Sequence, residues 1–222
     1  MTAALSARGC AAEPDHGCPL CPRLAGFLAQ HRQCEPSWYN GPVPSFGAAP
    51  ERTRVLIVGL APGLNGANRT GRPFTGDHAG ELLYSTLLRY GFATGTYEAR
   101  PDDTLKLRDT MITNAVRCVP PANKPTTAEI ATCRQFLTAR ISSLARLRAI
   151  VALGRIAHDS TVMALGLKNS AHPFGHGSVH DVRPGLKLYD SYHCSRYNTN
   201  TGVLTPAMFE AVFAAVRAAI DG

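Results

Sequence analysis

The sequence lacks any uninterrupted apolar stretch of the roughly 18–20 residues that a membrane-spanning helix needs. Its first residues, MTAALSARGCAAEPDHGC, contain no apolar core of signal-peptide length and soon become acidic and polar. These absences argue against a membrane protein and against a secreted one. We therefore expect a cytoplasmic protein with no membrane partner.

The sequence also lacks internal repeats and low-complexity tracts. Its 222 residues fit one compact domain, and a content of 45% hydrophobic and 18% charged residues is typical of a globular protein with a real core. We expect a single domain over residues 1–222, with residues 1–17 as a flexible tail, and a monomer.

Negative charge is scarce: 16 acidic residues stand against 23 Lys and Arg, which gives a formal net charge of +7. A basic protein suits a polyanionic partner, because Lys and Arg bind phosphates and release counterions. Many basic proteins bind no nucleic acid, so the charge alone does not decide between these two possibilities.

The pattern of apolar residues predicts alternating strands and helices. A short β-branched run that ends in glycine predicts a buried strand at 54–60, and further strands are predicted at 111–117, 149–155 and 187–194. Leucine spacing, capping signals and glycine stops predict helices at 80–90, 126–147, up to 165 and from 205 onward. This alternation predicts an α/β fold, a three-layer α/β/α sandwich around a central, mainly parallel four-stranded sheet. Sites in such sheets form beyond the carboxyl ends of the strands.

The seven cysteines are unlike a disulfide framework, because the expected compartment is reducing. Cys18 and Cys21 form a C-x2-C pair, and Cys118 and Cys133 form a second, wider pair. Thiolates two residues apart can turn onto one metal centre, as in zinc and iron–sulfur sites. Separate core thiols are the alternative reading, and the spacing alone leaves zinc and a cluster equally open.

A loop rich in glycine follows the first predicted strand, with GLAPG at 59–63. Glycines at this place let backbone N–H groups face a ligand without obstruction by a Cβ atom. A tight strand-to-helix turn and a phosphate-binding loop are the alternatives. The sequence matches neither the Walker A nor the G-x-G-x-x-G pattern, which disfavours a nucleotide cofactor.

Four motifs in order carry a resemblance to a known family. They are GLAPG at 59–63, GRPFTGDH at 71–78, TNAVRCVPPANKPT at 113–126 and SYHCSRYNTNTG at 191–202. Together they resemble the motifs of family 5 (type B) uracil-DNA glycosylases, over roughly residues 18–210, and part of the pattern is shared with the iron–sulfur family 4 enzymes. The resemblance implies the uracil-DNA glycosylase fold, and a structural [4Fe–4S] cluster held by Cys18, Cys21, Cys118 and Cys133.

The resemblance also implies the roles of the site residues. A flipped base would stack on Phe74 and meet the amide of Asn114, which offers a donor and an acceptor to the edge of uracil. His193 would donate to the carbonyl of the leaving base, and Asp77 would orient water or stabilise the cationic sugar. The predicted base-binding residues are Gly59, Ala61, Gly63, Phe74 and Asn114.

Each of these residues has a plainer alternative role. Phe74 could be a core aromatic, Asn114 a buried turn cap, and Asp77 an N-cap for the helix that follows, although one residue can both cap and catalyse. Two positions depart from related patterns: Leu60 replaces the Glu of family 4, which is itself a family 5 trait, and Cys194 replaces the usual proline.

The loop at 194–203 is expected to enter DNA at the minor-groove side. The predicted DNA-binding residues are Arg69, Arg72, Arg196, Tyr197 and Asn198. Arg117 and Lys124 are further candidates for phosphate contacts on the same rim. For any one of these cations, a solvated surface charge is an equal alternative.

The predicted function is that of a monofunctional DNA-repair glycosylase, which hydrolyses the N-glycosidic bond of uracil in DNA and leaves an abasic site. Hypoxanthine, ethenocytosine and 5-hydroxymethyluracil are expected further substrates, because the pocket lacks the family 4 carboxylate. No lysine occupies a recognisable Schiff-base position, so strand cleavage is not expected. The alternatives are a non-catalytic iron–sulfur protein that binds damaged DNA, and a structural zinc protein that binds RNA.

Overall fold

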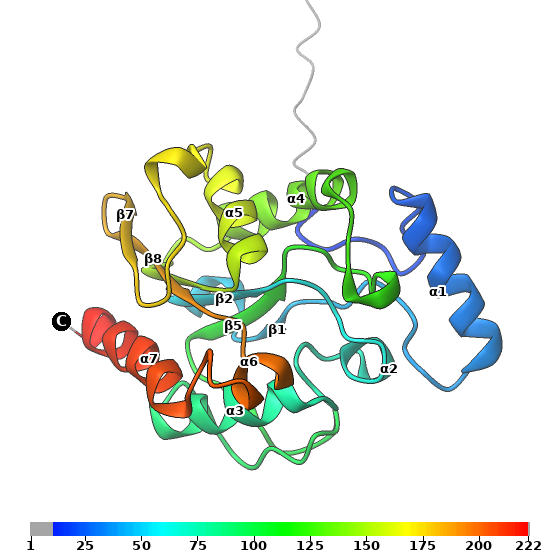
Figure 1. The fold of residues 1–222 in the computed structure, drawn as a ribbon, viewed down its shortest axis with the longest axis horizontal. Coiled ribbons are helices and arrows are strands. Elements are labelled where there is room, and N and C mark those ends of the chain that lie inside the picture. The colour runs from blue at the N-terminus through cyan, green and yellow to red at the C-terminus, as the bar shows by residue number, and fades with distance from the viewer. Residues whose placement is uncertain (1–10, 222) are drawn as a thin grey trace, which may run out of the picture.

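A mixed sheet of six strands forms the centre of the protein, in the order β1-β5-β2-β6-β8-β7 (Figure 1). The structure is a computed structural model and describes residues 11–221. The strands are β1 (Phe46–Gly47), β2 (Val55–Gly59), β3 (Ala93–Thr94), β4 (Lys106–Leu107), β5 (Thr110–Asn114), β6 (Ala149–Leu153), β7 (Val179–Arg183) and β8 (Leu186–Ser191). The α-helices are α1 (Pro22–Cys34), α2 (Ala67–Thr70), α3 (His78–Arg89), α4 (Thr127–Ser142), α5 (Arg155–Ala164), α6 (Arg196–Asn200) and α7 (Pro206–Asp221), and short 3-10 turns lie at Pro50–Arg52, Pro121–Asn123 and Asn169–Ala171.

The four strands predicted from sequence form the parallel centre of this sheet. β2 pairs in parallel with β5 and β6, and β6 pairs in parallel with β8. Two edge strands were not predicted: β1 pairs antiparallel with β5, and β7 pairs antiparallel with β8. The small strands β3 and β4 form a separate hairpin-like pair outside the main sheet.

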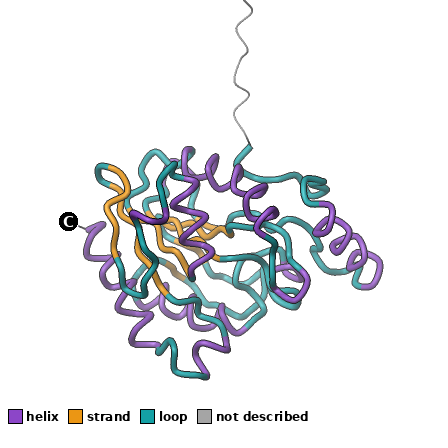
Figure 2. The backbone as a smooth tube through the Cα atoms, turned by 45° about the horizontal axis from the view of Figure 1, so that its top comes forward, coloured by secondary structure: helices purple, strands orange, loops and turns teal. Residues whose placement is uncertain are grey.

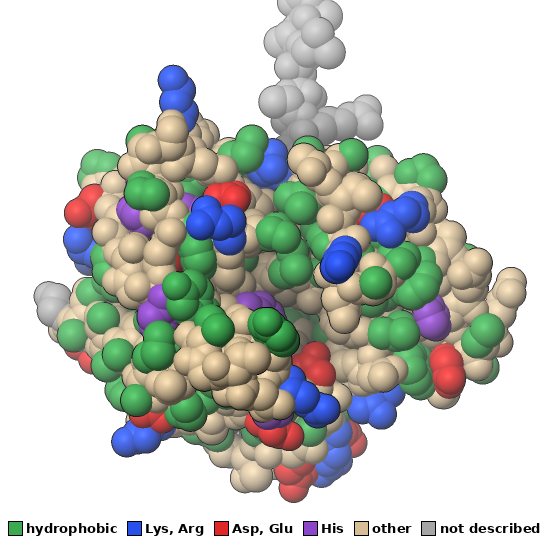
Figure 3. Space-filling view, in the orientation of Figure 1, with side chains coloured by type: hydrophobic (Ala, Val, Ile, Leu, Met, Phe, Trp, Pro, Cys, Tyr) green, Lys and Arg blue, Asp and Glu red, His purple; other side chains and the backbone are tan. Residues whose placement is uncertain are grey.

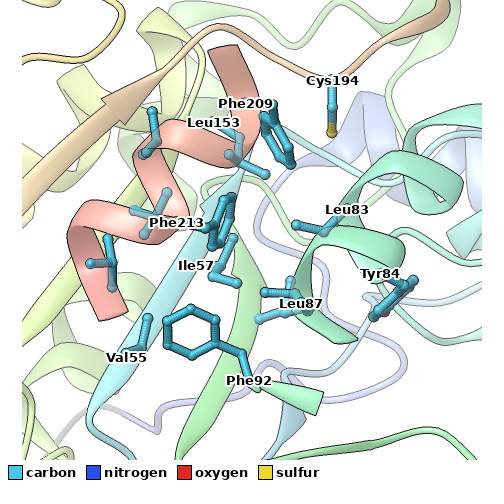
Figure 4. Packing of buried hydrophobic residues seen from close by; sticks show 14 of the residues in the cluster. Val55, Ile57, Leu83, Tyr84, Leu87, Phe92, Leu153, Cys194, Phe209 and Phe213 are labelled. Atoms are coloured by element: carbon cyan, nitrogen blue, oxygen red, sulfur yellow. The ribbon is translucent and has the colours of Figure 1, made fainter. Parts of the chain in front are cut away.

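Helices cover both faces of the sheet, which confirms the predicted three-layer α/β/α architecture (Figure 2). Every residue of β2 is buried, because its side chains alternate between two cores. Val55 and Ile57 pack against α3 and α7, where Phe213 lies at the centre of the contact (Figure 4). Leu56 and Val58 pack against α4 and α5 on the opposite face.

A third, smaller core lies between α1 and α4. Leu24 and Leu28 of α1 pack there against Phe136, next to Cys118 and Cys133. The two helices are also joined by an ion pair between Arg23 and Glu129, with 2.7 Å between Nη2 and Oε2. α1 was not among the predicted helices.

The prediction of a flexible tail over residues 1–17 was wrong for residues 11–17. Residues 1–10, with Cys10, lie outside the described part of the chain. Glu13 pairs with the buried guanidinium groups of Arg117 and Arg140 and accepts from the backbone N–H of Ser45. His16 contacts the carbonyl oxygen of Tyr39 at 3.0 Å. Residues 11–17 are therefore packed against the body of the protein.

Two helices begin with the caps that their sequences indicated. Thr126 accepts from the backbone N–H of Glu129, and Glu129 accepts from that of Thr126, so the predicted capping box of α4 is present. Asp77 is the N-cap of α3.

Within the described residues, none of the helices combines the length and the apolar character needed to cross a bilayer.

Candidate active site

A cavity of about 530 Å³ opens at the carboxyl end of the parallel strands. The surface is visibly hollowed near the middle of the face in Figure 3. The volume of the cavity lies within the roughly 300–1,000 Å³ that is common for small-molecule sites. Phe74, Asp77, Asn114 and His193 all line it, so the structure brings together the four side chains on which the sequence argument depends.

The floor of the cavity depends on a close approach between β2 and β5. Gly59 lies directly opposite Asn114 in the parallel register of these strands. A Cβ atom at Gly59 would lie 2.4 Å from Oδ1 of Asn114 and 2.7 Å from Cζ of Phe74. Gly59 therefore lies beneath the two predicted base-binding side chains, while Ala61 and Gly63 line the cavity itself.

Phe74 occupies a left-handed backbone conformation, with φ of 53°, which a bulky side chain seldom adopts. The buried Tyr84 and the partly buried Tyr97 hold the backbone in this conformation. Tyr84 donates its hydroxyl proton to the carbonyl oxygen of Pro73 at 2.6 Å, and Tyr97 donates to that of Phe74 at 3.2 Å. The ring of Phe74 is thereby fixed beside the ring of His193.

Asp77 combines a structural and an electrostatic role. Its Oδ1 accepts from the backbone N–H of Gly80 at 3.3 Å, which caps α3. Oδ2 lies so close to Gly66 that a Cβ atom there would come within 2.3 Å of it. Burial raises the pKa of Asp77, although hydrogen bonds from the N–H groups of Gly80 and Ala79 oppose the rise. A carboxylate with a raised pKa is suited to proton transfer.

His193 lies two residues after the end of β8, in the turn that leads to α6. Asn198 holds this turn, because its Nδ2 donates to the carbonyl oxygen of His193 at 2.8 Å. Burial lowers the pKa of His193 to about 4. The imidazole is therefore neutral near pH 7, and one ring nitrogen carries a proton that it can donate to a ligand.

The four predicted metal ligands surround one small cavity beside α1 and α4. Burial and mutual repulsion raise the pKa of Cys118 to about 12, and the other three thiols all contribute to this repulsion. The backbone N–H of Arg117 donates to Sγ of Cys133 at 3.3 Å. Four converging thiols and an N–H group directed at sulfur are a donor set that fits a thiolate-bound metal centre.

Comparison with known proteins decides the family. A sequence model described as the uracil DNA glycosylase superfamily matches residues 46–217. The chain is 46% identical to the type-5 uracil-DNA glycosylase of Thermus thermophilus, over 86% of this chain and 89% of that protein. It is 38% identical to the type-5 uracil-DNA glycosylase of Pyrobaculum aerophilum, over 92% of this chain and 88% of that protein. The chain belongs to the uracil-DNA glycosylase superfamily.

This membership confirms the family, the enzyme class and the fold class that the four motifs indicated. A type-4 uracil-DNA glycosylase of Archaeoglobus fulgidus is also similar, at 34% identity over 66% of this chain and 68% of that protein. The similarity to the type-5 proteins extends over more of the chain.

Two arginines predicted to lie on the rim of the glycosylase site are buried instead. Arg72 is 5% exposed and forms a bidentate pair with Asp103, with both N–O distances at 2.7 Å. Its guanidinium also faces the rings of Tyr84 and Tyr97. Arg117 is 2% exposed and pairs with Glu13. Neither side chain can reach a DNA phosphate, so both predictions were wrong.

The other predicted DNA-binding residues are distributed over the surface. Arg196 lines the cavity and is exposed, and Tyr197 on α6 is 74% exposed. Arg69 is exposed but lies in a neighbouring groove. The amide of Asn198, predicted to contact DNA, is bonded within the protein to the turn at His193.

Some residues of the site were not predicted. Asn65 and Asn123 line the cavity, and Tyr84 and Tyr97 fix the backbone at Phe74. Asn65 lies within the glycine-rich loop and Asn123 within the third motif, so polar residues inside these motifs were a usable signal. The role of the tyrosines depends on contacts between distant segments, for which the sequence carries no local signal.

The substitution of Cys194 for proline has a clear structural setting. Cys194 is fully buried, and its Sγ lies 3.5 Å from the carbonyl oxygen of Ala79. Ser195 then accepts from the backbone N–H of Asn198 and starts the short helix α6. The segment expected to be a loop is thus anchored at its start by a thiol in the core.

Proposed function

We propose that the protein is a DNA-repair glycosylase that hydrolyses the N-glycosidic bond of uracil in DNA and leaves an abasic site. The observation that carries this proposal is the convergence of Phe74, Asp77, Asn114 and His193 on one cavity. A cavity of this kind can receive a nucleotide only when it has been flipped out of the duplex, which costs a few kcal/mol and is cheapest at a mismatched base.

An aromatic face and an amide recognise the base. Phe74 offers a surface for stacking, and Asn114 offers both a donor and an acceptor to the edge of uracil. Oδ1 of Asn114 is buried and has no hydrogen-bond partner among the described residues. An unpartnered buried acceptor costs free energy, so its presence supports a role in binding a ligand.

His193 acts on the departing base, and Asp77 acts on the water that attacks the sugar. As the C1′–N1 bond breaks, its electron pair goes to the base, and the N–H of neutral His193 donates to the base carbonyl on which negative charge develops. Asp77 orients a water molecule whose oxygen bonds to C1′. The carboxylate accepts the proton that this water loses, and a proton returns to the departing base, so that hydrolysis is balanced.

We further propose that Cys18, Cys21, Cys118 and Cys133 hold a [4Fe–4S] cluster. One tetrahedral zinc ion, with bonds of about 2.3 Å, would draw its sulfur ligands to within about 4 Å of one another. Among the described residues, three ligand atoms within 4.8 Å of one another occur at a different place and not among these thiols. The wider spacing supports a cluster. With four thiolate ligands, the cluster would link the start of α1 to α4 and would serve a structural role.

DNA would lie across the open face of the cavity. Arg196 at the cavity rim is placed to contact a phosphate, and the exposed ring of Tyr197 beside it is placed to support the gap left by the flipped base. Arg69, which lines a neighbouring groove, would contact the phosphate backbone of the DNA. These DNA contacts are part of the proposal. We also propose that the protein is a monomer and that it is located in the cytoplasm.

The cavity favours a broader range of bases than uracil alone. Leu60 lines it at the position of the family 4 glutamate, so no carboxylate is present there to reject or select a base. We therefore propose that hypoxanthine, ethenocytosine and 5-hydroxymethyluracil are also released.

A single-turnover assay on short duplexes tests the function. Duplexes with U·G, U·A or hypoxanthine·T are incubated with excess protein and then treated with alkali, which cleaves at abasic sites. We expect cleavage by the wild type and a rate about 10²–10³-fold lower for His193→Asn. His31→Asn on α1, far from the cavity lining, is the matched control and should keep the wild-type rate. Binding of the duplexes without base release would refute the catalytic proposal and favour a non-catalytic damage-binding protein.

A further inference from the structure

A second group of potential metal ligands lies away from the cavity and away from the cysteines. His158 on α5, His180 on β7 and Asp190 on β8 each place one ligand atom within 4.8 Å of the other two. These elements adjoin at one edge of the sheet (Figure 1). The side chains of His158 and Asp190 are fully buried, and that of His180 is 14% exposed.

The hydrogen bonds of His158 orient it toward the centre of this group. Its Nε2 lies 2.7 Å from the carbonyl oxygen of His172, which has no proton to give, so Nε2 carries the proton of that bond. Nδ1 is directed at Oδ1 of Asp190, also at 2.7 Å. A histidine that ligates a metal through one nitrogen typically donates its other N–H to a carbonyl or a carboxylate in this way.

The carboxylate of Asp190 is shared by both histidines. Nε2 of His180 lies 3.3 Å from Oδ2, the second oxygen of this carboxylate. A buried His–Asp ion pair would account for His158 alone, but it gives no reason for a second imidazole on the other oxygen of the same carboxylate. Two imidazoles about one buried carboxylate form a set of donors that a cation can complete.

We propose that His158, His180 and Asp190 bind a divalent transition-metal ion, and that Zn²⁺ is the ion best suited to them. Two imidazole nitrogens and one carboxylate oxygen are a known type of zinc ligand set, whereas Mg²⁺ and Ca²⁺ prefer oxygen ligands throughout. Binding would replace any proton on Nδ1 of His158 and release it to solvent. The partial exposure of His180 provides a path for the ion, and a water molecule can complete the coordination.

The position of this group suggests a structural purpose. Asp190 is near the end of β8, three residues before His193 in the turn that follows, and its Oδ2 also accepts from the backbone N–H of Gly175 at 3.4 Å. The segment after Gly175 supports the same strand end, because Nδ1 of His176 accepts from the backbone N–H of Tyr192 at 3.1 Å. A metal ion would therefore join α5, β7 and β8 at the base of the turn that carries His193.

Metal analysis of the full chain, purified with its proposed [4Fe–4S] cluster in place, tests the proposal. The protein is incubated with a small excess of ZnSO₄, dialysed, and assayed for zinc and iron per chain. We expect one zinc per chain in the wild type and in the control His31→Gln, and loss of that zinc in His180→Gln. His180 is replaced because its partial exposure makes unfolding of the variant less of a risk than at the buried His158.

Thermal unfolding gives a second readout. Zinc at about 100 times its dissociation constant should raise the melting temperature of the wild type by about 5–10 °C and leave that of His180→Gln unchanged. Wild-type protein that retains no zinc would overturn the proposal. Equal retention by His180→Gln would also overturn it and would assign the zinc to the thiols instead.

Discussion

The rings of Phe74 and His193 lie nearly parallel, with centroids 5.9 Å apart and an angle of 27° between their planes. This separation is within the range of direct aromatic contact, about 4.5–7 Å. The two side chains come from the loop before α3 and from the end of β8. Because the two rings are in contact, a displacement of one ring would also displace the other. The position of the stacking surface, Phe74, therefore depends on the position of the proton donor, His193.

Replacement of His193 by Asn should make the stability of the protein less sensitive to acid. Burial lowers the pKa of His193 to about 4, whereas a histidine in the unfolded chain titrates near 6.5. Between these values the unfolded chain binds a proton that the folded protein does not, so the wild type loses stability as the pH falls from about 6.5 to about 4. Melting temperatures at pH 7 and pH 5 measure the loss. An equal drop in wild type and variant would contradict the prediction.

Replacement of Asp77 by Asn should separate catalysis from helix capping. Asn is as good an N-cap as Asp, so the stability of α3 should be kept while the charge is removed. We expect base release to slow by about 10²-fold or more. Asp77→Ala should slow the reaction as well, and in addition lower the free energy of unfolding by about 1 kcal/mol. Full activity of Asp77→Asn in the alkaline-cleavage assay would remove this carboxylate from the reaction.

Replacement of Gly59 by Ala should abolish base release, although Gly59 does not line the cavity. The added Cβ would overlap Oδ1 of Asn114 and the ring of Phe74, and relief of such overpacking typically costs about 1–3 kcal/mol. Gly26→Ala is the matched control, because no atom lies within 4 Å of its added Cβ. This change within α1 should stabilise the protein by about 0.5–1 kcal/mol and leave activity intact. Wild-type rates for Gly59→Ala would show that the floor of the cavity tolerates a side chain.

Two arginine variants should behave in opposite ways. The Arg72 guanidinium lowers the pKa of Asp103 to about 2, and Lys cannot form the same bidentate pair. Arg72→Lys should therefore lower the free energy of unfolding, by up to about 3–5 kcal/mol, and leave the salt dependence of DNA binding unchanged. Arg196→Ala should keep the stability and reduce the slope of log K against log salt by about one. Fluorescence anisotropy at several salt concentrations measures the slope, and a reduced slope for Arg72→Lys would place Arg72 on the DNA.

The sequence predicted those parts of the fold that have a strong local signal. Three of the four parallel strands, β2, β5 and β6, contain β-branched residues and are buried throughout, and the capping box at Thr126 and Glu129 is a short-range pattern. The edge strands gave no such signal. β1 has only two residues, and β7 reads VHDVR, with charged residues in a strand that is largely open to solvent.

The site shows the same division. Phe74, Asn114 and His193 follow the ends of strands or lie within family motifs, so their meeting could be predicted. The burial of Arg72 could not, because it depends on Asp103 in a separate loop and on tyrosines from two other segments. An arginine beside a predicted site looks the same in sequence whether it faces solvent or an aromatic enclosure.

The hydrogen bonds that hold the loop at position 74 have a consequence for redesign. Tyr84 and Tyr97 bond to backbone carbonyl oxygens and not to the side chain of Phe74. The backbone of this loop should therefore keep its conformation when the side chain at position 74 is changed. Gly59 limits the size of that side chain, because the ring of Phe74 already packs against it. Position 74 can therefore be varied among side chains no larger than Phe, and histidine there would change which damaged bases stack in the cavity while the surrounding backbone stays the same.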